Sequence, residues 1–434
     1  MWTLMSIIIV VSMAFCYIET IQGADNYLFR NLRDLNDEEK LFLAKDPLRN
    51  GRNEFSSAVC GRFHDLGYDV IYCNVAVFSS IDPDDRHECG SRTYFRTRDT
   101  KLWESFNVEI GVLVDSGKFI LSYEEPYYKR HIKRKVMIYD STCKSKNLEF
   151  SYGANSGDPL SRKSSIVVHR NTFDVIIADE SKCGTKEKCK LTYDETGDLL
   201  GVSSSLPTDY VAVRSGPLRP LSSDGAFFMV GYEENPRGNL SARFVSESGA
   251  IKKIDTDLSS DNLSLGIPVS TTYDLFTLCR MRYEPEQEVD GSWIVCRQFD
   301  SNSAALKMNV TLGYLNHIDA ISIYNFPKEG FLIATLACGN ETEKENCNLS
   351  VDKIEKVDEH TISINPYESN FKTSCGGGEN EIMLDIKPVD SDEYCFYIVC
   401  TTKPSPRNRF RTMSLSRKCV TLDHPLENID RRML

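Results

Sequence analysis

The chain has 434 residues and a formal net charge of −12, from 51 Lys and Arg against 63 Asp and Glu. Hydrophobic residues make up 41% and charged residues 26%, which is typical of a folded protein and excludes the profiles of a disordered or a multispanning membrane chain. The acidic balance disfavours nucleic acid and anionic membranes as partners, because both are bound through clustered positive charge.

The first 23 residues are typical of a secretory signal. An apolar stretch runs from Leu4 to about Tyr17, and polar residues and Gly23 follow it, so we expect cleavage after Gly23. A membrane anchor is the alternative, but the apolar stretch is too short to cross roughly 30 Å of hydrocarbon as a helix. The sequence therefore predicts a secreted, extracellular protein without a membrane span.

Residues 24–56 are expected to form an N-terminal arm. The run "LRDLNDEEKLFLAKDP" has helical spacing, acidic residues after Asn36 and Pro47 near its end. It predicts one short helix.

Seven similar apolar segments follow within residues 57–420. A shorter apolar stretch precedes most of them ("SSIVVHR", "DAISIYN"), and a polar tip and a third run follow ("CKLTYDE", "NLSVDKI"). Short runs of β-branched and aromatic residues, interrupted by Gly, Asp, Asn, Pro or Ser, are typical of strands. The first apolar residues of the seven segments are Val70, Phe119, Val175, Phe227, Leu275, Phe331 and Cys395.

The repeat predicts the fold. Four antiparallel strands in roughly 40 to 50 residues make one blade of a β-propeller. A single blade cannot bury both faces of its sheet, so neighbours around an axis must supply the core. We predict an all-β, seven-bladed β-propeller of four-stranded antiparallel blades, with a pair of β-sandwich domains as the alternative. The tail, residues 421–434, has no clear place, and its first residues are a candidate for completing the first blade.

The cysteines predict a disulfide framework. There are 15, of which Cys16 lies in the signal, and an even number in an exported chain indicates disulfides. Zinc is the alternative, but no C-x2-C spacing occurs. Opposed residues on antiparallel strands are close enough for a disulfide, and five repeats offer such a pair. These pairs are Cys73 with Cys89, Cys183 with Cys189, Cys279 with Cys296, Cys338 with Cys347, and Cys400 with Cys419.

Four cysteines then remain. One assignment pairs Cys60 with Cys143 and Cys375 with Cys395, but spacing alone does not fix it.

Five N-glycosylation sequons after a signal also predict a glycoprotein. They stand at Asn239, Asn262, Asn309, Asn340 and Asn348.

Motifs that carry chemistry are sparse. The seven histidines are scattered, and no zinc, nucleophile-elbow or phosphate-loop motif occurs, so we expect no metal and no cofactor. "SIDPDDRHEC" from Ser80 is expected to be a solvated hairpin tip, with a hard-cation site as the alternative. The basic run Lys129–Lys135 is expected to be an exposed turn, with a processing site or a patch for sulfated glycans as the alternatives.

The cysteine-stapled layout, with runs such as "GFLIAT", resembles the secreted β-propeller proteins among insect salivary, venom and uncharacterised secretory products. This resemblance covers residues 57 to about 420 and implies a secreted non-enzyme. The main hypothesis is therefore a monomeric binding protein that presents loops to an extracellular protein, glycan or small ligand. The alternative is an extracellular hydrolase or lyase with carboxylates in the central channel, at positions such as Asp115, Asp224 or Asp392.

Overall fold

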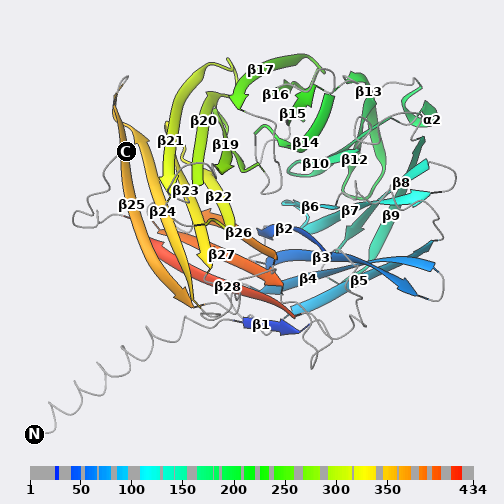
Figure 1. The fold of residues 1–434 in the computed structure, drawn as a ribbon. Coiled ribbons are helices and arrows are strands. Elements are labelled where there is room, and N and C mark those ends of the chain that lie inside the picture. The colour runs from blue at the N-terminus through cyan, green and yellow to red at the C-terminus, as the bar shows by residue number, and fades with distance from the viewer. Residues whose placement is uncertain are drawn as a thin grey trace, which may run out of the picture.

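The fold consists almost entirely of strands that form four-stranded antiparallel sheets (Figure 1). The computed structural model describes residues 25–28, 41–49, 54–65, 68–79, 86–95, 108–127, 131–140, 142–153, 164–178, 180–184, 188–206, 210–219, 225–233, 239–258, 267–283, 292–314, 317–338, 346–358, 361–372, 381–388, 393–401 and 412–422. Up to residue 108 the description covers the backbone alone.

In six sheets the four strands pair in chain order. These sheets comprise β2 (Leu41–Arg49), β3 (Glu54–Asp65), β4 (Tyr68–Ser79) and β5 (Arg86–Phe95); β6 (Val108–Leu113), β7 (Lys118–Tyr127), β8 (His131–Tyr139) and β9 (Ser145–Gly153); β10 (Ser165–Val168), β11 (Thr172–Ile177), β12 (Lys188–Asp194) and β13 (Leu199–Leu206); β14 (Tyr210–Pro217), β15 (Phe227–Glu233), β16 (Leu240–Val245) and β17 (Ile251–Leu258); β18 (Val269–Thr271), β19 (Leu275–Tyr283), β20 (Ser292–Asp300) and β21 (Leu306–Tyr314); β22 (Ala320–Asn325), β23 (Gly330–Cys338), β24 (Asn346–Lys356) and β25 (Ile362–Lys372). A short helix, α2 (Glu180–Cys183), lies between β11 and β12.

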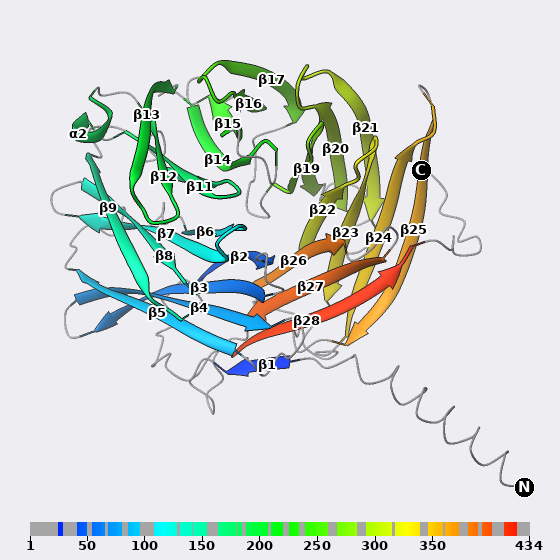
Figure 2. The same cartoon turned by 180° about the vertical axis from the view of Figure 1, so that it is seen from behind.

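The remaining sheet joins the two ends of the chain. Its order is β26 (Glu381–Pro388), β27 (Glu393–Thr401), β28 (Thr412–Thr421) and then β1 (Asp25–Leu28), which pairs antiparallel with β28. In both views β1 lies beside β28 at the lower edge (Figures 1 and 2).

The sheets follow one another around a ring (Figure 2). The first strands of successive sheets contact each other, as β6 contacts β10 and β10 contacts β14, while β2 contacts both β6 and β26. The core lies between neighbouring sheets. One cluster, for example, joins Ile120 and Val136 to Phe173 and Leu191 of the next sheet. This arrangement confirms the predicted all-β propeller of four-stranded antiparallel blades, and the number of seven blades stays a prediction.

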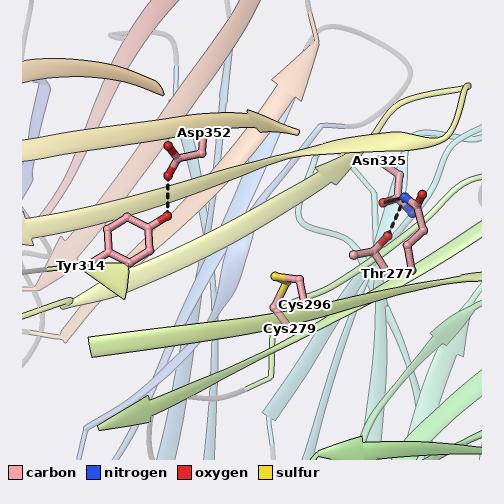
Figure 3. Close-up of a disulfide and its surroundings, with 7 residues drawn as sticks. Thr277, Cys279, Cys296, Tyr314, Asn325 and Asp352 are labelled. Atoms are coloured by element: carbon pink, nitrogen blue, oxygen red, sulfur yellow. Dashed lines mark hydrogen bonds between the residues drawn. A yellow bond between two sulfur atoms is a disulfide. The ribbon is translucent and has the colours of Figure 1, made fainter. Parts of the chain in front are cut away.

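Hydrogen bonds reinforce the contact between the sheets β18–β21 and β22–β25 (Figure 3). Tyr314 donates its hydroxyl to Asp352 Oδ2 of the next sheet at 2.6 Å. Gln298 Nε2 donates to Thr277 Oγ1 at 3.0 Å and to the carbonyl of Gly330 at 3.1 Å. These two sheets are thus fixed to each other by polar as well as apolar contacts.

The sequence located most blades correctly. Six of the seven apolar segments are the second strand of their sheet, and "NLEFSYG" and "SAALKMN" fall on the fourth strands β9 and β21. The first segment, from Asp69, is instead β4, the third strand of its sheet.

Three expectations about the chain ends need correction or remain open. The predicted helical run spans residues 32–47; its residues 41–47 belong to strand β2, and its residues 32–40 lie outside the described residues. The first blade consists of β2–β5, and the first residue of the tail, Thr421, instead ends β28 of the last sheet; residues 423–434 lie outside the described residues. The signal, residues 1–23, lies outside them as well.

Candidate functional site

Three of the predicted disulfides are confirmed. Cys279 with Cys296 and Cys338 with Cys347 occupy directly opposed positions on the second and third strands of their sheets, with Cα atoms 4.1 Å apart in both pairs. Cys183 at the end of α2 is joined to Cys189 on β12. The disulfides fit an extracellular protein.

The assignment of Cys419 to Cys400 is wrong, because Cys419 is joined to Cys395. The register of β27 and β28 sets Cys395 opposite Cys419 and Cys400 opposite Ser414, so the pairing of Cys375 with Cys395 is also wrong. Cys375 itself lies outside the described residues.

The first blade also differs from expectation. Cys73 on β4 lies opposite Cys60 on β3, while Cys89 on β5 lies opposite Val75. Cys73 and Cys89 therefore lack the directly opposed positions on which their predicted pairing depended. Cys143 is disulfide-bonded, and its assignment to Cys60 stays a prediction.

The described part of the basic run, from His131 to Lys135, lies on a strand and not in an exposed turn. Lys133, Arg134 and Lys135 lie on β8, while Lys129 and Arg130 lie outside the described residues. Lys133 Nζ lies 2.5 Å from Glu149 Oε2 on β9, and Lys135 Nζ lies 3.9 Å from the other oxygen of that carboxylate. Arg134 points the opposite way and is fully buried. A protease could not bind Arg134 in the folded protein.

Arg134 is the centre of a buried charged cluster. Its guanidinium donates to Glu109 on β6, to Glu124 Oε1 on β7 at 3.2 Å, and to Ser122 Oγ at 2.8 Å. It also donates to the carbonyl of Ser164 at 2.8 Å, so the cluster joins two sheets. With Glu109 5% and Glu124 3% exposed, no ligand reaches these carboxylates. We therefore assign them a structural role.

A second buried cluster lies within the next sheet. His169 Nε2 lies 2.9 Å from Asp174 Oδ2, and Thr192 Oγ1 donates to Asp174 Oδ1 at 2.6 Å. Both His169 and Asp174 are buried. This cluster too is closed to solvent.

Of the carboxylates proposed for the central channel, Asp115 lies within the described residues. Asp115 lies in the turn between β6 and β7, exposed, and accepts a hydrogen bond from Arg170 Nε at 2.7 Å. Asp224 and Asp392 lie outside the described residues, as does the acidic tip, residues 80–85. No group of three His, Cys, Asp or Glu side chains suited to a metal ion occurs in the part of the chain that the structure describes.

Tyr273 forms the candidate functional site, which lies on the turns of two neighbouring sheets. This aromatic residue lies in the turn between β18 and β19, and its side chain is 65% exposed. A polar residue would be expected at such an exposed position. The guanidinium of Arg219, which follows β14 of the preceding sheet, lies 5.2 Å from the centre of the Tyr273 ring. A cation over an aromatic ring is attracted by its quadrupole and holds it in place.

Hydrogen bonds fix the polar groups around this ring. Arg219 Nη2 donates to Asn302 Oδ1, and Asn302 Nδ2 donates to Asp274 Oδ1 at 3.4 Å. Ser301 Oγ donates to the carbonyl of Tyr273 at 2.9 Å. An exposed ring thus stands beside a guanidinium, an amide and a carboxylate that are already oriented.

Asp300 is a further carboxylate of the turn that holds Ser301 and Asn302. The backbone N–H of Ser303 donates to Asp300 Oδ1 at 2.7 Å, and that of Asn302 at 3.0 Å. The hydrogen bond from Ser303 holds the pKa of Asp300 below its usual value. The charge of this carboxylate therefore persists throughout the neutral range.

The sequence did not single out Tyr273, Arg219 or Asn302. The stretch "TTYDLF" contains one signal, an aromatic residue among turn residues just before a buried strand. Arg219 and Asn302 could not be recognised in this way, because their relation to Tyr273 depends on how two sheets pack.

The described sequons all lie on the surface. Asn239, Asn309 on β21 and Asn348 on β24 are exposed, as glycan attachment requires. Asn262 and Asn340 lie outside the described residues.

In the described part of the chain, no helix is long and apolar enough to cross a membrane.

Comparisons with known proteins find likeness only among solved structures, which are β-propeller proteins. No protein-family model and no curated protein matches the sequence. The α-L-arabinofuranosidase of Fusarium graminearum with arabinobiose is 8% identical, with 92% of this chain and 98% of that chain covered and a TM-score of 0.41. Drosophila Semaphorin 1a, extracellular domains 1–2, is 11% identical, with 91% and 88% covered and a TM-score of 0.40. Similarity at this level assigns no function.

Proposed function

We propose that the protein is a secreted, extracellular binding protein whose ligand is a carbohydrate, bound at the turn surface around Tyr273. The observation that carries this proposal is the Tyr273 ring, exposed and held by Arg219. The C–H face of a sugar ring stacks on an aromatic ring, and its hydroxyls hydrogen-bond to carboxylates, amides and guanidinium groups. Tyr273, Asp274, Asn302 and Arg219 supply this set.

Secretion is part of the proposal. It is supported by the signal-like residues 1–23, the disulfides and the exposed sequons. Expression in insect cells, with N-terminal sequencing of protein recovered from the medium, should give Ala24 as the first residue. Protein retained in the cells with an intact leader would contradict this part of the proposal.

The ligand can be sought on a glycan array and then titrated by calorimetry. Tyr273→Ala should weaken binding about tenfold, because an aromatic stacking contact contributes on the order of 1 kcal/mol beyond its area. Tyr273→Trp should retain binding. The matched control is Val357→Ala, because Val357 is 64% exposed just after β24 and is an aliphatic residue outside this surface. Equal affinities for wild type and Tyr273→Ala would refute the site.

Glycoside hydrolysis is a second candidate, favoured by one detail of the same surface. Asn302 donates its side-chain Nδ2 to Asp274 and its backbone N–H to Asp300, so two carboxylates are bonded to the residue that also accepts from Arg219. Asp300, with its lowered pKa, suits the role of a base or nucleophile, and Asp274 would have to donate the proton. Arabinobiose and nitrophenyl glycosides serve as substrates. Hydrolysis that Asp274→Asn abolishes, with binding retained, would favour an enzyme, whereas binding without turnover would leave the binding protein.

A further inference from the structure

Asn309 stands in the middle of an exposed strand. It lies on β21, the outermost strand of the sheet β18–β21 (Figure 1), within the sequon Asn309-Val310-Thr311. Val310 is buried in the core that this sheet shares with the next one, whereas Asn309 and Thr311 are exposed. The side-chain amide of Asn309 therefore projects from the opposite side of the sheet, which solvent reaches.

An apolar side chain lies close to Asn309 on the same side of the sheet. Residues directly opposite each other on antiparallel strands point to one side, and Asn309 lies opposite Arg297 while Leu306 lies opposite Phe299. Arg297 and Phe299 are two residues apart on β20, so the four side chains share that side. Leu306 is 52% exposed there, only three positions from Asn309 along the strand.

The other direction along β21 is apolar as well. Thr311 lies opposite Val295, and Gly313 lies opposite Trp293. A Cβ added at Gly313 would come within 3.1 Å of the Trp293 ring, so this ring lies over the glycine. Val295 and Trp293 are both half-buried. Asn309 is thus in the middle of a strip that is apolar at both ends.

We propose that Asn309 carries an N-linked glycan whose first sugars pack against Leu306 and cover this strip. The acetamido methyl group and the C–H face of the first N-acetylglucosamine are apolar, so their contact with Leu306 removes apolar surface from water. The glycan also blocks strand addition to β21, because an outermost strand offers unpaired N–H and C=O groups to other chains. The inference rests on the secretory route proposed above and is independent of the carbohydrate site at Tyr273.

The other described sequons lack such a neighbour. Asn348 on β24 lies opposite Ala337 on β23, and Ser350 is the next residue of β24 on that side. In the described part of the chain, no exposed large apolar residue lies within five positions of Asn239 or Asn348. A glycan at either position would extend into solvent, so these two sequons provide controls.

Peptide mapping of protein recovered from the medium of insect cells tests the occupancy of the sequon. We expect the peptide that contains Asn309 to carry a glycan. An unmodified Asn309 in the secreted protein would overturn this inference and leave secretion standing. Protein retained in the cells with an intact leader would contradict the secretory route, and this inference with it.

A double-mutant cycle tests the contact between the glycan and Leu306. In the glycosylated protein, Leu306→Ser should lower the thermal unfolding midpoint by about 1 to 2 °C, because it removes apolar area that the sugar covers. In the Thr311→Ala variant, which keeps Asn309 but lacks the sequon, the same substitution should have less than half this effect. Asn348→Gln is the matched control, since loss of that glycan should leave the effect of Leu306→Ser unchanged.

Equal effects of Leu306→Ser with and without the sequon at Asn309 would overturn the proposal. If Thr311→Ala is not recovered in folded form, enzymatic removal of the glycans from folded wild type and folded Leu306→Ser gives the same comparison. The difference in midpoint between these two proteins should then shrink by more than half. A difference that persists in full after deglycosylation would overturn the proposal as well.

Discussion

Arg134 is a charged side chain placed where water does not reach it. Two glutamates and two serines satisfy its donors, and the backbone N–H groups of Ser164 and Ile166 donate to the same glutamates. Burying ions costs several kcal/mol each, and only mutual attraction and complete hydrogen bonding offset that cost. The cluster therefore tolerates removal of one member poorly.

We expect Arg134→Met to lower the free energy of unfolding by about 3 to 5 kcal/mol, because it leaves Glu109 and Glu124 buried without the guanidinium. Equilibrium urea unfolding measures the loss. The control is Lys133→Met, whose partner Glu149 is half exposed, with an expected loss of about 1 kcal/mol or less. The triple variant Arg134→Met, Glu109→Gln, Glu124→Gln should regain part of the stability. A loss at Arg134 no larger than at Lys133 would contradict the assignment.

The sequence contained enough to place Arg134 but not to interpret it. Once β8 is a strand, alternation sets Arg134 on the same face as Val136 and Ile138, which are core residues. The density of positive charge in the run suggested an exposed turn instead. Tyr273, in contrast, could not be placed from local sequence. Its role depends on Arg219, which is distant in sequence and belongs to another sheet.

Between third and fourth strands, short turns recur that are capped by their own first residue. Asp140 Oδ1 accepts from the backbone N–H of Thr142 at 2.9 Å, and Asp300 Oδ1 accepts from that of Ser303. A positive φ follows in each turn, at Cys143 and at Ala304. The Thr142 hydroxyl holds the pKa of Asp140 below its usual value, as Ser303 does for Asp300.

These turns predict an acid-dependent stability. A carboxyl group with a lowered folded-state pKa stabilises the fold fully above its unfolded pKa, near 4, and loses this contribution as pH falls through the folded value. The free energy of unfolding should therefore fall between about pH 5 and pH 2. The double variant Asp140→Asn, Asp300→Asn should flatten this fall, and Glu247→Gln, in the turn between β16 and β17, should not. Equal slopes for both variants would contradict the role of the capped turns.

At the level of strands, the sequence predicted the second and third strands of most blades but misread the N-terminal blade and one cysteine pairing. Apolar runs identified the second and third strands because these are covered on both faces. The N-terminal blade was misread because β2 and β3 lack such continuous runs, so β4 was taken as a second strand. Cys395 was misassigned because register, and not proximity in a motif, decides which cysteines meet.

One pair of strands, β1 with β28, brings N-terminal and C-terminal segments together within one sheet. Without β1, the positions Thr412–Leu415 of β28 would have no neighbour on their outer side. The pairing therefore stabilises the last sheet, which also contacts the first sheet through β2 and β26.

We expect deletion of residues 25–28 to lower the thermal unfolding midpoint by several degrees, because it removes a strand and exposes an edge. Calorimetry of the secreted protein measures this change. Asn26→Ala, which keeps the backbone pairing with Ser414, serves as the control and should unfold close to the wild type. A deletion variant with the wild-type midpoint would show that the pairing contributes nothing.

The position of β1 also sets the order of events during synthesis. Its partner begins at Thr412, so about 380 residues must be made after β1 before the pair can form. At roughly 5 to 20 residues per second, β1 waits some 20 to 80 s. Throughout that interval the nascent chain carries β1 without its partner, and the last blade cannot form until β28 has been made.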